Sequence, residues 1–151
     1  MAFRISWRTS LTAFKGVMRA KHGKLKGMTL AHKKISIYLD QWTKRNMKSE
    51  GGLLSDGAWK PFKAGGRRKG GSIDTSAKLL QDTGTLRLSL LPFHNRKTAG
   101  IGSSLKYAKT HELGLGNVPQ RRLLPRDSEV RVGVRDIFKA HVKDSIGGSG
   151  L

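Results

Sequence analysis

The sequence predicts an α+β fold in which long amphipathic helices accompany a β-hairpin. An apolar stripe with helical spacing runs through residues 28–48, and a second such stripe runs through residues 128–146. Between them, the apolar segments Leu91–His94 and Ala99–Ser103 flank a polar tip, which is typical of a hairpin. A length of 151 residues suits one core, so we expect residues 1–151 to form a single domain.

The predicted helix over residues 28–48 has all its large apolar residues on one side. They follow one another at spacings of 3, 4, 3, 1 and 3, and basic residues lie off the stripe. Thr29 is suited to cap the start of the helix, and Gly51-Gly52 to end it. The stripe consists of Met28, Ala31, Ile35, Tyr38, Leu39 and Trp42, and the basic residues are Lys33, Lys34, Lys44 and Arg45.

Both ends of the chain are expected to add helices. Residues 1–27 predict a basic N-terminal region with a short helix from Ser10 to about Lys21 and a linker. Residues 126–146 predict a C-terminal helix, although Val130–Val134 could also open as a strand. The segment Lys78–Leu90 fits either a strand or a helix, because its leucines satisfy both periods.

The charge of the chain is strongly positive and unevenly distributed. Thirty Lys and Arg face ten Asp and Glu, which gives a net charge of +20. Residues 1–71 carry 17 basic and 3 acidic side chains, a net +14, whereas residues 72–151 carry a net +6. Such a chain is expected to meet a polyanion or a crowded assembly. With no cysteine, disulfides, thiolate nucleophiles and Cys-based metal sites are excluded.

Residues 51–76 are predicted to form a flexible, glycine-rich basic loop. Seven glycines fall within residues 51–71, and a composition of this kind buries too little apolar surface to order itself. Its cations would bind phosphates without sequence preference. The residues expected to contact DNA or an acidic partner are Lys60, Lys63, Arg67, Arg68 and Lys69.

No catalytic, metal-binding or cofactor-binding residues are expected. His111-Glu112 resembles the start of an HExxH metal motif, but Leu115 occupies the position of the second histidine. No nucleophile elbow or phosphate-binding loop is present. Arg4 and Arg8 interrupt the apolar N-terminus, and no apolar run reaches the length of a membrane span, so we expect no membrane partner.

Four sequence pieces occur in an order that carries a family resemblance. They are Gly57-Ala58-Trp59-Lys60-Pro61-Phe62; Leu79-Leu80 with Thr83-Gly84 and Leu86; Ile101-Gly102 with Tyr107-Ala108, His111-Glu112 and Gly114; and Pro119, Arg121 and Leu123-Leu124. Over about residues 28–125 the chain resembles the tailed-phage virion morphogenesis family, the Mu-like tail completion or neck proteins. It departs from the family pattern at Glu112, where Gln is frequent, at Arg122, where a second proline is common, and at Leu123, where Phe is usual.

The resemblance implies a long helix packed on a small antiparallel sheet, and it favours a short helix within Thr83–Leu90. It also implies a non-enzymatic tail completion or neck subunit that forms a closed ring and joins the capsid portal to the tail around the DNA channel. Its partners would be copies of itself, neighbouring head-side connector and tail proteins, and the genome; its location would be the virion, after assembly in the host cytoplasm. The alternative is a small nucleic-acid-binding protein that acts through the Gly/Arg/Lys loop, and a hydrolase built on His111-Glu112 ranks third.

Several residues of the shared pieces have expected structural roles. Thr83-Gly84 can cap and turn into the next segment, and Gly102 permits a close backbone approach. Tyr107 and His111 share a face of a short helix that stops at Gly114, and a core pair is favoured for them over a binding role. The residues expected to be structural are Trp59, Thr83, Gly84, Leu86, Gly102, Tyr107, His111 and Gly114; Leu80 and Ile101 are expected to join Trp59 and Leu86 in the core.

A subunit interface is expected in the stiff segment between Pro119 and Pro125. The guanidinium of Arg121 is a planar bidentate donor and would suit a carboxylate of a neighbouring subunit. The residues expected at this interface are Pro119, Arg121, Arg122, Leu123 and Leu124.

Overall fold

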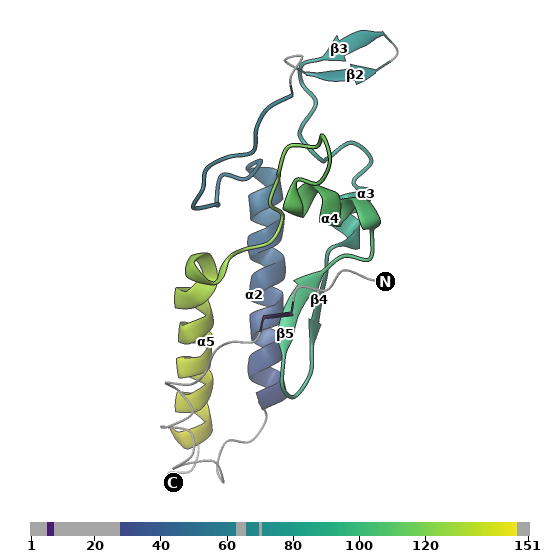
Figure 1. Ribbon diagram of the computed structural model, residues 1–151. Coiled ribbons are helices and arrows are strands. Elements are labelled where there is room, and N and C mark those ends of the chain that lie inside the picture. The colour runs from purple at the N-terminus through teal and green to yellow at the C-terminus, as the bar shows by residue number, and fades with distance from the viewer. Residues whose placement is uncertain (1–5, 8–27, 63–65, 70, 148–151) are drawn as a thin grey trace.

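The computed structural model describes residues 6–7, 28–62, 66–69 and 71–147, and it confirms the α+β class (Figure 1). The predicted helix from Ser10 to Lys21 lies outside the described residues. The elements are β1 (Ser6–Trp7), α2 (Met28–Lys48), β2 (Arg67–Lys69), β3 (Ser72–Asp74), α3 (Thr85–Ser89), β4 (Leu91–His94), β5 (Ala99–Gly102), α4 (Lys106–Leu113) and α5 (Asp127–Gly147). In the part of the chain described, none of the helices has the length and apolar character of a membrane span.

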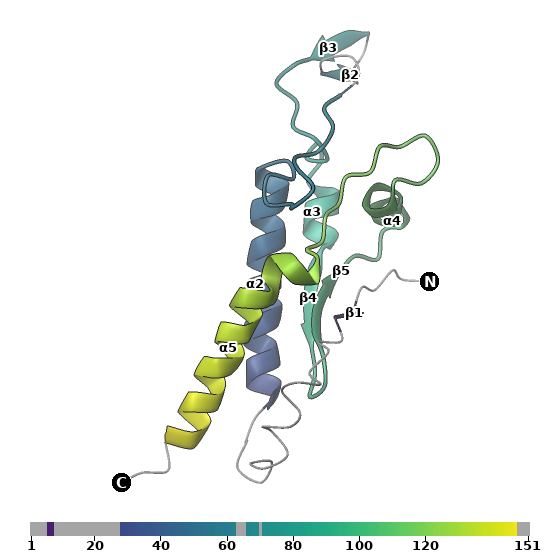
Figure 2. The same cartoon turned by 60° about the vertical axis from the view of Figure 1, so that its left-hand side comes forward.

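Helix α2 is the central element of the fold. The β4–β5 hairpin packs along one side of it and α5 along another (Figure 2). The predicted stripe is the buried side of α2, as burial of Ala31, Ile35, Leu39 and Trp42 shows. The helix is therefore held by its apolar face, as the period of the sequence requires.

The C-terminal end of α2 is fixed by Gly51. Its backbone has a φ of +88°, in the left-handed region that favours glycine, and its amide donates to the carbonyl of Asn46 over 2.9 Å. A Cβ on Gly51 would collide with the indole of Trp59. Glycine is thus required here both by the turn and by the tryptophan packed on it.

The main sheet has the strand order β1-β5-β4, and all its pairs are antiparallel. Phe93 on β4 lies opposite Gly100 on β5, and a Cβ on Gly100 would stand 2.5 Å from the phenyl ring. A close approach is therefore observed at Gly100, where the ring covers the bare backbone, and the one expected at Gly102 stays a prediction. Pro92 lies on β4, at the edge of the sheet, where a missing amide donor costs least.

The glycine-rich segment, residues 51–76, consists of two structurally different parts, which its composition alone does not distinguish. Leu54 and Trp59 are buried, so the first part is anchored to the body of the protein. Strands β2 and β3 then pair as a hairpin that projects beyond the end of α2 (Figure 1). We call residues 66–76 the arm. Sequence reasoning did not predict these two strands, because the glycine content outweighed the signal of a two-residue turn between Lys69 and Ser72. The mobility of the segment stays a prediction.

The structure settles the elements that the sequence left open. Thr85–Ser89 is helical, which confirms the short helix before the hairpin. Helix α4 ends at Gly114, whose φ is +65°, as expected. Helix α5 is continuous from Asp127 to Gly147, so the alternative of a strand at Val130–Val134 is wrong.

One apolar core joins these elements. Trp59, Leu86 and Ile101 are buried together with the stripe of α2, as expected, and Leu80 is half-buried beside them. Helix α5 contributes three further residues of its predicted stripe, Val130, Val134 and Phe138.

A buried histidine, His32, lies where α2 faces α5. Its ring meets the edge of Phe138 at a centroid distance of 6.0 Å, and its Nδ1 donates to the carbonyl of Asn95 over 2.9 Å. Burial lowers the pKa of His32 below 6.5, and the neighbouring His94 and His141 lower it further, against the opposing effect of the hydrogen bond.

We expect Leu86→Ala to lower the free energy of unfolding by about 2–5 kcal/mol, because it leaves a cavity in the core. Leu88 lies on the same helix but is 71% exposed, against 4% for Leu86, so Leu88→Ala is the matched control. Urea denaturation of the two variants measures the difference. Equal stabilities would contradict the packing of α3.

Stability should fall on acidification through the range of histidine titration. Because the pKa of folded His32 lies below the unfolded value of 6.5, the unfolded chain binds the proton first, and stability present above pH 6.5 is lost as pH falls below it. Urea denaturation at a series of pH values between about 7.5 and 5 measures this slope. His32→Gln should flatten the slope, whereas His94→Gln, at an exposed position, should change it less. An unchanged slope in His32→Gln would contradict this assignment.

Candidate functional site

Three of the four sequence pieces of the family pattern converge at the C-terminal end of α2. Residues of α2, α4, α5 and two connecting segments meet there through buried polar contacts. We call this cluster the motif junction; it comprises Asn46, Asp56, Trp59, Glu112, Arg122, Leu123, Leu124 and Glu129.

The guanidinium of Arg122 is the charged centre of the motif junction. Its Nη2 lies 2.6 Å from Oε1 of Glu129 and 2.7 Å from Oδ1 of Asp56, and its Nη1 lies 2.9 Å from Oε2 of Glu129. The side chains of Arg122 and Glu129 are each only 6% exposed. The contact is therefore a bidentate, buried ion pair, the strongest geometry available to these groups.

Glu129 also accepts hydrogen bonds from two backbone amides, one in the loop after α2 and one just before α5. Its carboxylate accepts the amides of Ser55 and Arg126 at 2.8 and 2.7 Å. Burial alone would raise the pKa of Glu129, but the hydrogen bonds from Arg122 and from these amides outweigh burial and lower that pKa to about 2. The carboxylate is thus ionised at any physiological pH.

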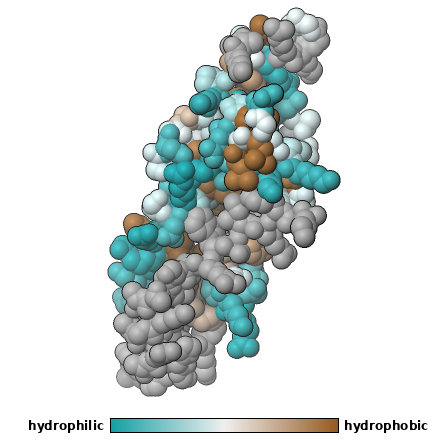
Figure 3. Space-filling view, viewed as in Figure 1, coloured by the Kyte–Doolittle hydropathy of each residue, from teal (hydrophilic) through white to brown (hydrophobic). Residues whose placement is uncertain are grey.

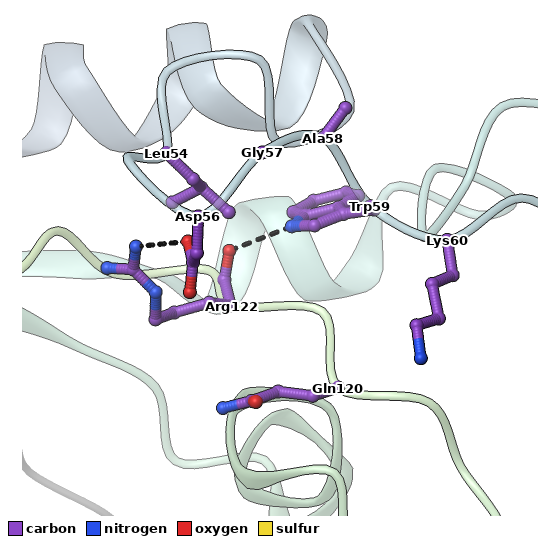
Figure 4. Close-up of a pocket in the computed structure, with 8 residues that line it drawn as sticks. All are labelled: Leu54, Asp56, Gly57, Ala58, Trp59, Lys60, Gln120 and Arg122. Atoms are coloured by element: carbon purple, nitrogen blue, oxygen red, sulfur yellow. Dashed lines mark hydrogen bonds and ion pairs between the residues drawn. The ribbon is translucent and has the colours of Figure 1, made fainter.

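The backbone carbonyl of Arg122 holds the other elements of the junction. It accepts Nε1 of Trp59 at 2.9 Å (Figure 4) and Nδ2 of Asn46 at 3.3 Å. One residue of an irregular segment thereby connects the end of α2, the loop after it and the start of α5.

The carboxylate of Glu112, which the HExxH motif would assign to metal chemistry, binds backbone amides of the same chain. Its Oε2 accepts the amides of Leu123 and Leu124 at 2.6 and 3.2 Å, and burial raises its pKa against these hydrogen bonds. An amide oxygen of Gln could accept the same two bonds, which accounts for the Gln of the family pattern. Across the described residues, no three His, Asp or Glu side chains are arranged to hold a metal ion.

The segment expected at a subunit interface lies largely inside the protein. Arg121, Arg122, Leu123 and Leu124 are all buried, and Pro119 is half-buried. The guanidinium of Arg121 donates to the carbonyl of Lys60 at 3.2 Å and lies over the ring of Phe62. The guanidinium of Arg121 is therefore bound within the subunit, and its expected role at a subunit interface stays a prediction.

Among the residues expected to be structural, Tyr107 departs from its expected role. It is 43% exposed and meets the half-buried His111 only edge-on, with ring centroids 6.4 Å apart, so the pair does not form part of the core. Thr83 Oγ1 accepts the amide of Thr85 over 3.4 Å, and Gly84, with a φ of +73°, precedes α3, so this turn is as expected.

The basic residues expected to contact DNA lie in both parts of the glycine-rich segment. Lys60 is exposed beside the motif junction, whereas Arg67 forms an ion pair with Asp82. Arg68 and Lys69 belong to β2, and Lys63 lies outside the described residues.

A shallow pocket of about 200 Å³ opens beside the motif junction. It is lined by Leu54, Asp56, Gly57, Ala58, Trp59, Lys60, Gln120 and Arg122 (Figure 4). The polar groups of Trp59, Asp56 and Arg122 are already engaged with one another across this pocket, so its walls stabilise the fold.

The surface around α4 carries exposed apolar side chains that are not part of the core. Figure 3 shows apolar groups gathered over α4, where Leu113 and Leu115 are exposed. Leu88 and Leu91 are exposed at the corner between α3 and β4. Exposed apolar groups of this kind mark a protein contact more often than a catalytic site.

Sequence reasoning missed Asn46, Asp56 and Glu129 as partners of the junction. A local signal existed for Glu129, because a Glu in the first turn of a helix commonly reaches back to the amide preceding it. No local pattern links Asp56 to Arg122, since 66 residues separate them.

Arg122→Ala should lower the free energy of unfolding by about 3–5 kcal/mol, because it leaves the buried carboxylate of Glu129 without a charged partner. Arg131→Ala removes an exposed pair with Asp127 on the same helix as Glu129 and should cost at most about 1 kcal/mol. Denaturant unfolding of both variants measures the contrast. A small effect of Arg122→Ala would show that the ion pair does not organise the junction.

Comparison with known protein families supports the family resemblance that the four sequence pieces carry. The model of the phage virion morphogenesis family matches residues 5–143 of the chain. No curated protein and no solved structure matched it. Because the match covers the whole of the described fold except the last residues of α5, the chain belongs to the phage virion morphogenesis family.

Proposed function

We propose that the protein is a tail completion or neck subunit, which forms a closed ring and joins the capsid portal to the tail around the DNA channel. Membership of a virion morphogenesis family supports a role in virion structure or assembly. The ring and its position in the neck go beyond that membership and rest on the shape of the subunit.

The observation that carries the proposal is the arm. A body fixed by the buried motif junction carries a two-stranded hairpin that projects beyond the end of α2 (Figure 1), and Ile73 on this hairpin is exposed. A two-stranded hairpin gains little stability by itself in water, so a projecting one suits a subunit that contacts neighbours. The apolar groups over α4 offer a second surface on the same body (Figure 3). Two different surfaces allow a head-to-tail contact, which closes into a ring when the rotation fits.

Loss of the protein should leave filled heads and finished tails unjoined, because the proposed ring is the connection between them. Electron microscopy of lysates from a phage that lacks the protein tests this. A variant with residues 66–75 replaced by a short Gly-Ser linker should fold but fail to restore joining, whereas Arg131→Ala should restore it.

Two outcomes would contradict the proposal. Lysates without packaged heads or without tails would place the protein at an earlier step of assembly. Full restoration by the variant without the arm would show that the arm makes no essential contact.

A further inference from the structure

The outer face of α2 is a continuous basic surface. From Lys33 to Lys48 its exposed residues fall within an arc of about 120° on the helical wheel and extend over about 22 Å. They comprise Lys33, Lys34, Ile37, Gln41, Lys44, Arg45 and Lys48. The β4–β5 hairpin and α5 pack on other sides of the helix (Figure 2), so neither of these described elements covers this face.

Among the described residues, the cations of this face have no ion-pair partner, with one exception. Lys44 pairs with Asp40 at 2.7 Å. For Lys33, Lys34, Arg45 and Lys48, no carboxylate of the described residues lies within ion-pair distance. Like charges this close on one helix repel one another, so the face is destabilised unless an anion covers it.

Helix α5 provides an internal comparison of equal length. It also exposes four cations, but its acidic residues are interleaved with them. Arg131 pairs with Asp127 at 2.9 Å, and Arg135 with Asp136 at 3.3 Å. Two of the four exposed cations of α5 are thus neutralised by a neighbouring acid, against one of five on α2.

We propose that the outer face of α2 binds the phosphate backbone of double-stranded DNA without sequence preference. A second copy of the chain is a poor occupant, because Glu112 and the side chain of Glu129 are buried and Asp127 and Asp136 of α5 are paired with cations. Duplex DNA carries one charge per about 1.7 Å, which a straight 22 Å row of cations can follow. The inference deepens the proposed function only by naming which surface would face the genome.

Salt-dependent binding of the purified full chain to a fluorescent DNA duplex tests the proposal. The α2 variant replaces Lys33, Lys34, Arg45 and Lys48 by Gln; the control replaces Arg131, Arg135, Lys139 and Lys143 by Gln and removes the same charge. We expect the slope of log affinity against log salt to flatten by up to about 3.6 in the α2 variant and the affinity to fall about tenfold or more, with a smaller change in the control.

Asp40→Asn supplies a test whose expected result is a gain of binding, which misfolding would not produce. It removes the one acid on the face and frees Lys44, so binding should become tighter, by about two- to tenfold, and its salt slope steeper by up to about one. Circular dichroism verifies the fold of each variant.

Three results would overturn the proposal: no DNA binding by the wild-type chain, equal loss in the α2 variant and the control, or loss of binding only when Arg67, Arg68 and Lys69 of the arm are neutralised. Native mass spectrometry of the same samples records ring formation. Rings without DNA binding would refute this inference alone, and DNA binding without rings would refute the ring alone.

Discussion

The buried ion pair of Arg122 with Glu129 and Asp56 is the constraint on which the rest of the structure depends. Burying these charges is costly, and breaking the pair would leave an uncompensated carboxylate inside the protein. The guanidinium can satisfy both partners only if Ser55–Asp56, the segment before α5 and the first turn of α5 keep one relative position. The carbonyl of the same residue then fixes Trp59 and Asn46. A charged group in the interior thus defines where α2, α5 and the loop from Ser55 to Trp59 are placed, which an apolar contact of equal size would define less sharply.

The motif junction also brings together pieces of the family pattern that are distant in sequence. Trp59 and Glu112 belong to two of the pieces, and both hydrogen-bond to the backbone of residues 122–124, which includes Leu123-Leu124 of a third. Arg122 itself stands where the family pattern commonly has a proline. Leu86, from the fourth, lies in the core that the junction closes. The pattern therefore specifies a scaffold, and the surfaces that meet other molecules lie elsewhere, on α2, around α4 and on the arm.

The sequence predicted those parts of the fold whose signal is local. The stripe from Met28 to Trp42 and the hairpin around Asn95–Thr98 follow from periodicity and turn chemistry, and both are confirmed. The site was harder, because Arg121 and Arg122 stand between prolines in a segment that composition assigns to the surface, where arginines usually lie. Their burial depends on Lys60, Asp56 and Glu129, which the fold brings together from different parts of the chain. The single-domain boundary, the mobility of the glycine-rich segment and the expected roles in contacts between subunits remain predictions.

The allocation of the few acidic residues connects the interior to the surface. Only ten Asp and Glu accompany thirty Lys and Arg, and the motif junction takes Glu112, Glu129 and Asp56. Asp127 and Asp136 neutralise cations on α5, and Asp82 pairs with Arg67 near the arm. This leaves α2 with Asp40 alone against five cations. The carboxylates that fix the fold are thus too far from the outer face of α2 to screen its cations. The positive charge of this face follows from the same arrangement that orders the core. Such a face persists at neutral pH and is weakened mainly by salt, so contact with a polyanion would be strong in dilute buffer and readily broken as ionic strength rises.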